Sequence, residues 1–171
     1  MASAVVRIRA GTATRHIREG GPDFERRARS LRVILIDTGP LVAAALAGDK
    51  NHMVCVDLFT AAHLAGDELL IPSFVVTEAC YMLAREAGPR VEIGFVRSLA
   101  AGDFTIVDVG LRDLTRIAQL MERYNDLPLG LVDASVIALA EKLGLTEVAT
   151  LDRRHFAVVR PSHVDALKLL P

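Results

Sequence analysis

The sequence predicts an α/β fold in which helices cover both faces of a parallel sheet. Short apolar strands alternate with helices along the chain, the order typical of parallel sheets. The first strand, residues 33–36, holds four branched apolar side chains and ends at the acidic residue Asp37. Open α/β sheets place their ligand sites at such carboxyl ends of strands. The 171 residues, 51% hydrophobic and 24% charged, suit one globular domain.

The other elements follow from apolar periodicity and from the glycines that interrupt it. After the first strand, Gly39 and Pro40 are expected to turn the chain. The pattern then predicts helices over 40–47 and 52–65, a strand over 69–71, helices over 73–87 and 91–101, a strand over 104–107, helices over 111–124 and 131–143, and a strand over 148–151. The tail, residues 156–170, is expected to hold one or two short extended pieces.

Several classes of protein are excluded by composition. The apolar runs are shorter than the ~18 residues of a membrane span, and the arginine-rich N-terminus lacks the apolar core of a signal peptide. Cys55 and Cys80 have neither metal-site spacing nor the pattern of a disulfide framework. Both lie in apolar helical patterns, so we interpret them as small core residues. We expect a soluble cytoplasmic protein.

Charge is unevenly distributed along the chain. The formal net charge is −1, but residues 1–32 contain eight arginines against three acidic residues, a net +5 that leaves −6 on residues 33–171. We interpret residues 1–32 as a basic, flexible leader and residues 33–171 as the folded domain. Two alternatives stay open: an arm that binds nucleic acid electrostatically, and translation that starts near Val33.

Two acidic residues directly follow predicted strands. Asp37 follows the strand at 33–36, and Asp152 follows the strand at 148–151. Asp is also a common turn and helix-capping residue. Taken alone, Asp37 is better explained by such a structural role, and Asp152 is explained equally well by a structural or a functional role.

Two further acids lie on predicted helices among apolar neighbours. Glu78 is expected to point with the core-facing stripe of its helix, because the residues three and four positions away are Phe74, Val75, Tyr81 and Met82. The alternative is a half-exposed glutamate at the edge of that stripe, whereas Glu86 is expected to be solvated. Asp133 has Val136, Ile137 and Ala140 as helical neighbours. A carboxylate beside a core is costly unless it is paired or binds a cation, so we favour a functional role over an N-cap for Asp133.

Together the four acids predict a site for a hard divalent cation. Converging carboxylates repel one another by roughly 4 kcal/mol per pair at 4 Å and an effective dielectric of 20, and no buried base is available to offset this. Oxygen-rich acidic sites are preferred by Mg²⁺ and Mn²⁺. One or two such ions can activate a water and stabilise the leaving oxygen in phosphodiester hydrolysis.

Other catalytic motifs are absent from the sequence. The histidines at 16, 52, 63, 155 and 163 are scattered and do not form the H-E-x-x-H pair of a zinc site. The chain also lacks the G-x-x-x-x-G-K-[ST] loop, the G-x-G-x-x-G fingerprint and the G-x-S-x-G elbow.

Four segments in order resemble the motifs of a PIN domain, and most closely those of small prokaryotic VapC-type toxin ribonucleases. They are residues 36–42 (IDTGPLV), 77–78 (TE), 131–135 (LVDAS) and 150–156 (TLDRRHF). Each motif is weak alone, but their order and spacing make the resemblance specific. It covers residues 33–171 and leaves the basic leader without a counterpart. It implies a three-layer α/β/α sandwich around a mainly parallel sheet, with the four acids gathered at one end.

The resemblance also implies roles for individual residues. Asp37 and Asp133 match the usual metal ligands, Glu78 and Asp152 match acids that hold metal or position water, and Thr150 matches a frequent Thr or Ser near the last acid. Some relatives have a further acid where this chain has Leu129 and Gly130, a place that only Asp126 could take. Arg153, Arg154 and Arg85 are candidates for phosphate contacts, although a solvated surface role is the simpler interpretation of each.

The function that the resemblance implies is a Mg²⁺- or Mn²⁺-dependent endoribonuclease, the toxin of a toxin–antitoxin pair. Its expected partners are an RNA substrate, a cognate antitoxin and a second copy of the chain in a homodimer, with no membrane. A non-catalytic PIN-like RNA-binding or assembly module is one alternative, and the presence of all four acids speaks against it. A phosphatase of the haloacid dehalogenase class is another, but it needs a second Asp where this chain has Gly39.

Overall fold

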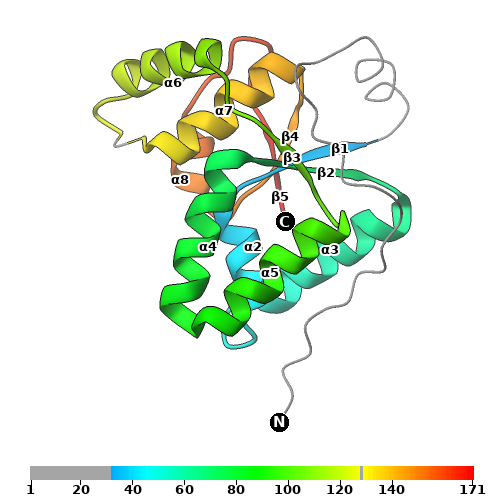
Figure 1. Cartoon of the computed structure of the whole chain (residues 1–171). Coiled ribbons are helices and arrows are strands. Elements are labelled where there is room, and N and C mark those ends of the chain that lie inside the picture. Colours follow the sequence, from blue (N-terminus) through cyan, green and yellow to red (C-terminus); the bar gives the residue numbers. More distant parts are fainter. Residues whose placement is uncertain (1–31, 128) are drawn as a thin grey trace.

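The computed structural model describes residues 32–127 and 129–171 (Figure 1). Its centre is a five-stranded sheet in the order β3-β2-β1-β4-β5, and every neighbouring pair of strands is parallel. The parallel sheet expected from the sequence is therefore confirmed. The strands are β1 (Val33–Ile36), β2 (Glu68–Pro72), β3 (Thr105–Val107), β4 (Glu147–Ala149) and β5 (Lys168–Leu170).

Helices cover both faces of this sheet. Figure 1 shows α6 and α7 on one side of the strands and α3 and α5 on the other, which gives the three layers implied by the family resemblance. The helices of the described residues are α2 (Thr38–Ala45), α3 (His52–Ala65), α4 (Ser73–Ala87), α5 (Pro89–Ala101), α6 (Leu111–Arg123), α7 (Leu131–Leu143) and α8 (Arg153–Phe156).

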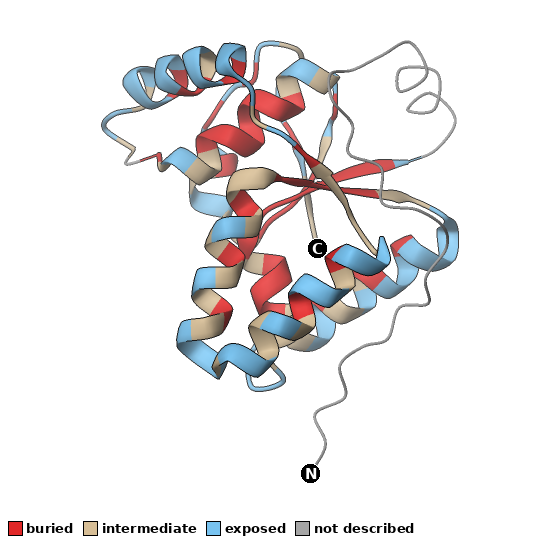
Figure 2. Cartoon of the chain, in the orientation of Figure 1, coloured by how far each residue is buried: buried red, intermediate tan, exposed pale blue. Residues whose placement is uncertain are grey.

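The core is centred on β1 and α7. Strand β1 is buried along its whole length and lies between β2 and β4, with Leu35 in register with Leu70 and Val148. In α7 the run from Ala134 to Ala140 is buried without interruption, and Figure 2 shows β1 and the middle of α7 in red. A helix with apolar residues on all sides is one that is buried on all sides. β1 ends at Asp37 and α7 begins beside Asp133, so these two acids are attached to the most deeply buried elements of the described structure.

The expectation of a turn at Gly39 and Pro40 is wrong, because α2 begins immediately after β1. Asp37 is the N-cap and Pro40 lies in the first turn of the helix, where the missing proline N–H would have no partner within the helix anyway. A Cβ on Gly39 would lie 3.3 Å from the Cβ of Leu151. The small residue thus lets the start of α2 pack closely against the segment that follows β4.

The segment after β4 also differs from the sequence expectation. Strand β4 ends at Ala149, two residues before the predicted end, and the short helix α8 was not predicted. Its formation depends on Asp152, which caps it, rather than on any apolar period. The extended piece expected in the tail is confirmed as β5.

Arg32 connects the proposed leader to the domain. Its guanidinium Nε lies 2.5 Å from Glu147 Oε2 and its Nη1 lies 3.4 Å from Asp67 Oδ2, while its carbonyl oxygen accepts a hydrogen bond from the Glu68 N–H. Residue 32, placed in the leader from the sequence, therefore packs on the start of the sheet. The rest of the proposed leader, residues 1–31, lies outside the described residues.

The two cysteines are both free thiols. Cys55 is buried, as expected, and Cys80 is half-buried against the core. Within residues 32–127 and 129–171 there is no helix long and apolar enough to span a membrane.

Candidate active site

Asp37 occupies the carboxyl end of β1 and is only 5% exposed. One carboxylate oxygen, Oδ1, accepts a hydrogen bond from the Thr38 N–H at 2.7 Å, and the other, Oδ2, accepts one from the Thr150 hydroxyl at 2.7 Å. The residue therefore does cap a helix, as its alternative interpretation held. It also faces other acids, so capping does not exclude a functional role.

Glu78 lies in the second turn of α4, which follows β2. It is half-buried, and its Oε2 accepts a hydrogen bond of 2.5 Å from the Thr38 hydroxyl. The expectation that Glu78 points with the core-facing stripe needs correction, because Tyr81 is 64% exposed. Glu78 lies instead at the edge of the buried stripe, which is formed by Val75, Ala79 and Leu83. As expected, Glu86 is exposed.

Asp133 lies in the first turn of α7 and is half-buried. It is not the N-cap, which is Gly130, but its Oδ2 accepts a 3.3 Å hydrogen bond from the Gly130 N–H. The same oxygen lies 3.4 Å from His155 Nδ1. One carboxylate thus satisfies a free N–H at the helix start and also faces the site.

Asp152 follows β4 and caps α8. Its Oδ1 accepts hydrogen bonds from the N–H groups of Arg154 and His155 at 3.0 and 3.1 Å. Its Oδ2 lies 2.7 Å from His155 Nδ1. The Asp152 N–H in turn donates to the Thr150 hydroxyl, so Thr150 links Asp152 to Asp37.

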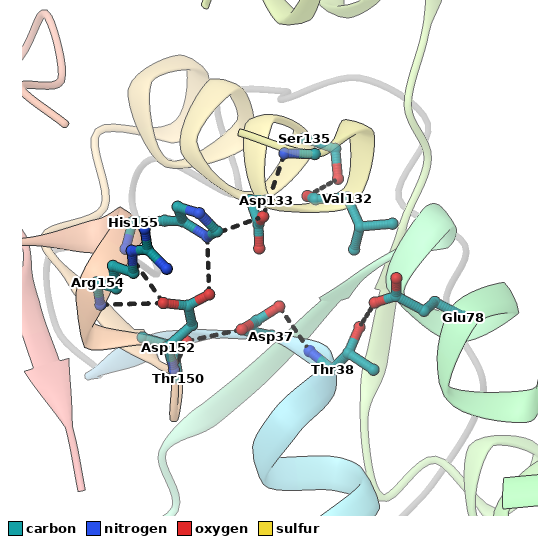
Figure 3. Close-up of polar contacts among 11 residues, drawn as sticks. Asp37, Thr38, Glu78, Val132, Asp133, Ser135, Thr150, Asp152, Arg154 and His155 are labelled. Atoms are coloured by element: carbon teal, nitrogen blue, oxygen red, sulfur yellow. Dashed lines mark hydrogen bonds and ion pairs between the residues drawn. The ribbon is translucent and has the colours of Figure 1, made fainter. Parts of the chain in front are cut away.

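The structure brings these four acids together at the carboxyl edge of the sheet. Figure 3 shows their carboxylates pointing toward a common centre from β1, α4, α7 and the segment before α8. Two threonines and a histidine bridge them: Thr38 joins Asp37 to Glu78, Thr150 joins Asp37 to Asp152, and His155 joins Asp152 to Asp133. Among the described residues, no lysine or arginine forms an ion pair with any of the four.

Burial and mutual repulsion raise the pKa of two of the acids. The pKa of Asp37 is raised to about 6, mainly by burial and further by the charges of Asp133 and Glu78, although the hydrogen bonds from Thr150 and Thr38 lower it. Burial also raises the pKa of Asp133, supported by the charges of Asp152 and Glu78 and opposed by Gly130 and His155. Raised carboxyl pKa values in a cluster without cationic partners distinguish it from a structural ion pair and make it the candidate functional site.

His155 and Thr38 are site residues that sequence reasoning missed. His155 was counted among the scattered histidines, but its ring lies within contact distance of two of the acids. Neither ring nitrogen makes a hydrogen bond of good direction, so the contacts with the carboxylates are electrostatic. Its position three residues after Asp152 was the available signal, because residues three apart face each other on a helix. Thr38 could have been found as the residue next to a helix-capping acid.

The side chains of the candidate phosphate-binding arginines and of the possible fifth acid form no hydrogen bond or ion pair with the four acids in the described structure. The Arg153 guanidinium donates to the Pro171 carbonyl oxygen at 2.6 Å, and that of Arg85 pairs with Glu86. The Arg154 side chain is exposed beside Asp152. Asp126 is exposed as well, and in the described structure it makes no hydrogen bond or ion pair with the four acids.

A sequence model of the PIN domain matches residues 34–160. The chain belongs to the PIN domain family. Ribonuclease VapC26 from Mycobacterium tuberculosis is 30% identical over 131 residues, which cover 75% of this chain and 93% of the relative. The family implied by the four sequence motifs is thus confirmed.

Several solved structures share the fold of this chain. The M. tuberculosis toxin VapC20, described as cleaving the sarcin–ricin loop, superposes with a TM-score of 0.66 at 20% identity, over 77% of this chain and 98% of the toxin. DNA-bound VapBC from Salmonella typhimurium superposes with a TM-score of 0.59 at 18% identity, over 81% of this chain and 98% of that chain. VapBC2 from Rickettsia felis, bound to a promoter fragment, gives 0.59 at 15% identity, over 81% and 99%.

The donor set of this PIN domain fits a divalent cation. One ligand atom from each of Asp133, Asp152 and His155 lies within 4.8 Å of the other two. Asp37 and Glu78 are not part of this group, but they lie beside it, close enough for the charges of Asp133 and Glu78 to raise the pKa of Asp37. Carboxylate oxygens that lack a cationic side chain suit hard ions such as Mg²⁺ and Mn²⁺. Such an ion would relieve the repulsion that raises the pKa of Asp37.

Proposed function

We propose that this PIN domain is an endoribonuclease that depends on Mg²⁺ or Mn²⁺. The observation that carries the proposal is the convergence of four acids, one of them buried, with no lysine or arginine paired to them in the described part of the chain. Carboxylates arranged in this way destabilise the metal-free protein, so a structural role alone gives no reason for their arrangement. Similarity to a ribonuclease of the same family supports RNA as the substrate.

Asp37 and Asp133 would hold the ion, with Glu78 and Asp152 as further ligands or as the groups that position water. A bound divalent ion supplies an activated water and charge stabilisation for the departing oxygen. Thr38 and Thr150 hold the carboxylate of Asp37 in one orientation through the hydrogen bonds described above. Because these bonds lock the ligand rotamers before the ion arrives, the site is preorganised.

Metal-dependent hydrolysis at this site would leave defined chemical groups at the ends of the RNA fragments. Oxygen from water bonds to phosphorus as the bond to the 3′ oxygen breaks, and a proton is transferred to that leaving oxygen. The products are a 5′-phosphate and a 3′-hydroxyl. A metal-independent attack by the ribose 2′-hydroxyl would instead leave a 2′,3′-cyclic phosphate and a 5′-hydroxyl.

Product-end analysis therefore tests the proposal. RNA incubated with the EDTA-treated protein should stay intact, and added Mg²⁺ or Mn²⁺ should yield fragments with 5′-phosphate and 3′-hydroxyl ends. Asp37→Asn should abolish these fragments. Cyclic phosphate ends, or cleavage that persists in EDTA, would contradict the proposed chemistry.

We further propose that the chain acts as the toxin of a toxin–antitoxin pair and forms a homodimer. Two of the structural relatives are VapBC proteins bound to DNA. The proposal predicts that expression of the chain stops growth, that co-expression of a small neighbouring gene restores it, and that Asp37→Asn is harmless alone. Growth arrest by the Asp37→Asn protein would point to a non-catalytic module instead.

A further inference from the structure

A second cluster on α4, outside the acidic site, combines an exposed aromatic ring with an arginine. Tyr81 is 64% exposed, and the central carbon of the Arg85 guanidinium lies 5.6 Å from the centre of its ring. This is within the distance at which a guanidinium is attracted to an aromatic face. Exposure of this extent means that folding buries little of the ring, so the fold itself gives no reason for a tyrosine at this position.

The cluster lies on the same side of the helix as Glu78. Residues three and seven positions after Glu78 follow it along one face of a helix with 3.6 residues per turn, and these are Tyr81 and Arg85. The buried stripe of α4 lies on a different face. The Tyr81–Arg85 pair thus begins about one turn from an acid of the proposed catalytic site and continues along the solvent side of α4.

An exposed tyrosine beside an arginine has the chemistry of a nucleobase platform. Unpaired bases stack on aromatic rings and on guanidinium planes, and such stacking tolerates any base because each has a π-face. Arg85 also contacts Glu86 through Nε and Nη2 at 2.9 and 2.6 Å. This ion pair is exposed on both sides, so it contributes little and a phosphate can replace it.

We propose that Tyr81 and Arg85 form a stacking subsite that holds an unpaired RNA base next to the acidic site. The proposal rests on the ribonuclease function proposed above. RNA is favoured over a protein partner because Tyr81 is the only large apolar side chain exposed on α4 within the described residues. A protein-docking helix face needs several such side chains in a row.

Substitution of Tyr81 tests the subsite by RNA binding. We measure fluorescence anisotropy in EDTA, so that no cleavage occurs, with a short 5′-labelled RNA that has no self-complementarity. Because base–aromatic stacking is worth about 1–3 kcal/mol, Tyr81→Leu should weaken binding by about 5- to 150-fold. Tyr81→Phe, which keeps the ring, should stay within about 3-fold of the wild type. Leu64→Ala, which alters an exposed side chain near the end of α3, is the matched control and should have no effect.

Two features separate stacking from charge attraction. Tyr81→Leu should weaken binding of the unpaired RNA much more than binding of its duplex, because paired bases are already stacked on one another. It should also leave the salt dependence of binding unchanged, since no charge is altered. If Arg85 replaces its Glu86 pair by a phosphate, Arg85→Ala should reduce the log–log salt slope by up to about 0.7, and Arg97→Ala on α5 should reduce it less.

Tryptophan fluorescence gives a direct readout of the contact. The natural chain has no tryptophan, so Tyr81→Trp introduces a single emitter at the proposed platform. The unpaired RNA should quench this emission while binding at least as tightly as it binds the wild type. Binding without quenching would place the base elsewhere and overturn the proposal.

The remaining outcomes are also decisive. Wild-type affinity of Tyr81→Leu for the unpaired RNA overturns the subsite and leaves the nuclease proposal standing. If that variant instead loses self-association on size exclusion with RNA affinity unchanged, α4 is a protein-contact surface and the subsite is wrong. In Mg²⁺, a rise in KM with unchanged kcat supports the subsite. Failure of the wild type to bind any RNA overturns both proposals.

Discussion

The surroundings of Asp37 disfavour its charged form in the metal-free protein, which agrees with its proposed role as a cation ligand. It is buried, hydrogen-bonded through both oxygens and surrounded by acids, and these surroundings raise its pKa to about 6. An unfolded aspartate has a pKa near 3.8. The folded state therefore binds a proton more tightly, so the stabilisation it gains from that proton is complete below pH ~4 and is lost as pH rises through about 6.

The first prediction follows from this shift in the metal-free protein. In EDTA, Asp37→Asn should gain stability relative to the wild type as pH rises from about 4 to 7, by on the order of 3 kcal/mol at 1.36 kcal/mol per pKa unit. Urea melts of both proteins at several pH values measure this difference. Asp57→Asn, which alters an exposed residue of α3, is the control and should show no such trend. A pH-independent difference for Asp37→Asn would mean that its carboxyl is not desolvated.

Thr150 gives a second prediction at the same scale. It is 1% exposed, donates to Asp37 Oδ2 and accepts from the Asp152 N–H. Thr150→Val keeps the shape and removes both hydrogen bonds, so it should destabilise the protein by about 1–3 kcal/mol. Thr150→Ser keeps the hydroxyl and should cost less than about half of this. Equal losses for the two variants in thermal melts would assign the effect to packing.

At the scale of elements, α6 and α7 begin with the same local pattern and use it differently. Residues 110–113 and 130–133 both read Gly-Leu-x-Asp, and in each the aspartate accepts from the N–H of the glycine, at 2.8 Å in α6 and 3.3 Å in α7. Asp113 is paired with Lys142 at 3.0 Å. Asp133 faces other carboxylates instead. The same position in a helix therefore pairs with a lysine in α6 and faces other acids in α7, where we propose that it binds a cation.

The comparison of Asp113 with Asp133 provides a prediction together with its control. Asp113→Asn should destabilise the metal-free protein by about 1–3 kcal/mol, because Lys142 loses its partner. Asp133→Asn should be neutral or stabilising in EDTA, since the amide keeps an acceptor for Gly130 and removes repulsion from the other acids. Thermal melts of both variants in EDTA decide the matter. A clear loss of stability in Asp133→Asn would make Asp133 a structural cap.

Elements with a long run of periodically spaced apolar residues were predictable from the sequence. Elements that depend on a single polar contact were not. Helices α3, α4 and α7 have the predicted bounds because glycines end their apolar runs. The start of α2 and the whole of α8 depend instead on capping by Asp37 and Asp152. A capping aspartate and a turn aspartate look alike in a sequence. For the same reason His155, carried by α8, was missed.

At the scale of the whole molecule, the order of the strands in the sheet brings the four acids together. Strands β1 and β4 are neighbours although 110 residues separate their ends, and α4 and α7 meet beside them. The sequence indicated which acids are exceptional, because each lies among apolar residues. It does not contain the distances between them, which arise from strand pairing. Their convergence was therefore a prediction, made from their apolar context, their placement at strand ends and on helix faces, and the family resemblance, until the sheet order was known.

A further prediction concerns the basic leader. A chain that begins at Arg32 keeps the ion pairs to Glu147 and Asp67 and should melt at the temperature of the full chain. Its cleavage rate at saturating RNA should be unchanged, and at most its affinity and salt dependence should fall, by a log–log slope of about 0.7 per lost phosphate contact. Melts and salt-dependent binding of both chains test this. Aggregation of the shortened chain would show that residues 1–31 contribute to folding.

The central claim is that the four acids, and not the acidic residues in general, form the cation site for RNA cleavage. The most direct measurement is the rate of RNA cleavage in Mg²⁺ by the wild type, Asp133→Asn and Asp113→Asn, side by side at a temperature where all three are folded. We predict that Asp133→Asn loses cleavage by at least about 100-fold, the upper end of what a supporting residue contributes, while Asp113→Asn stays near the wild type. Cleavage by Asp133→Asn at the wild-type rate, or equal loss in both variants, would contradict the assignment of the site.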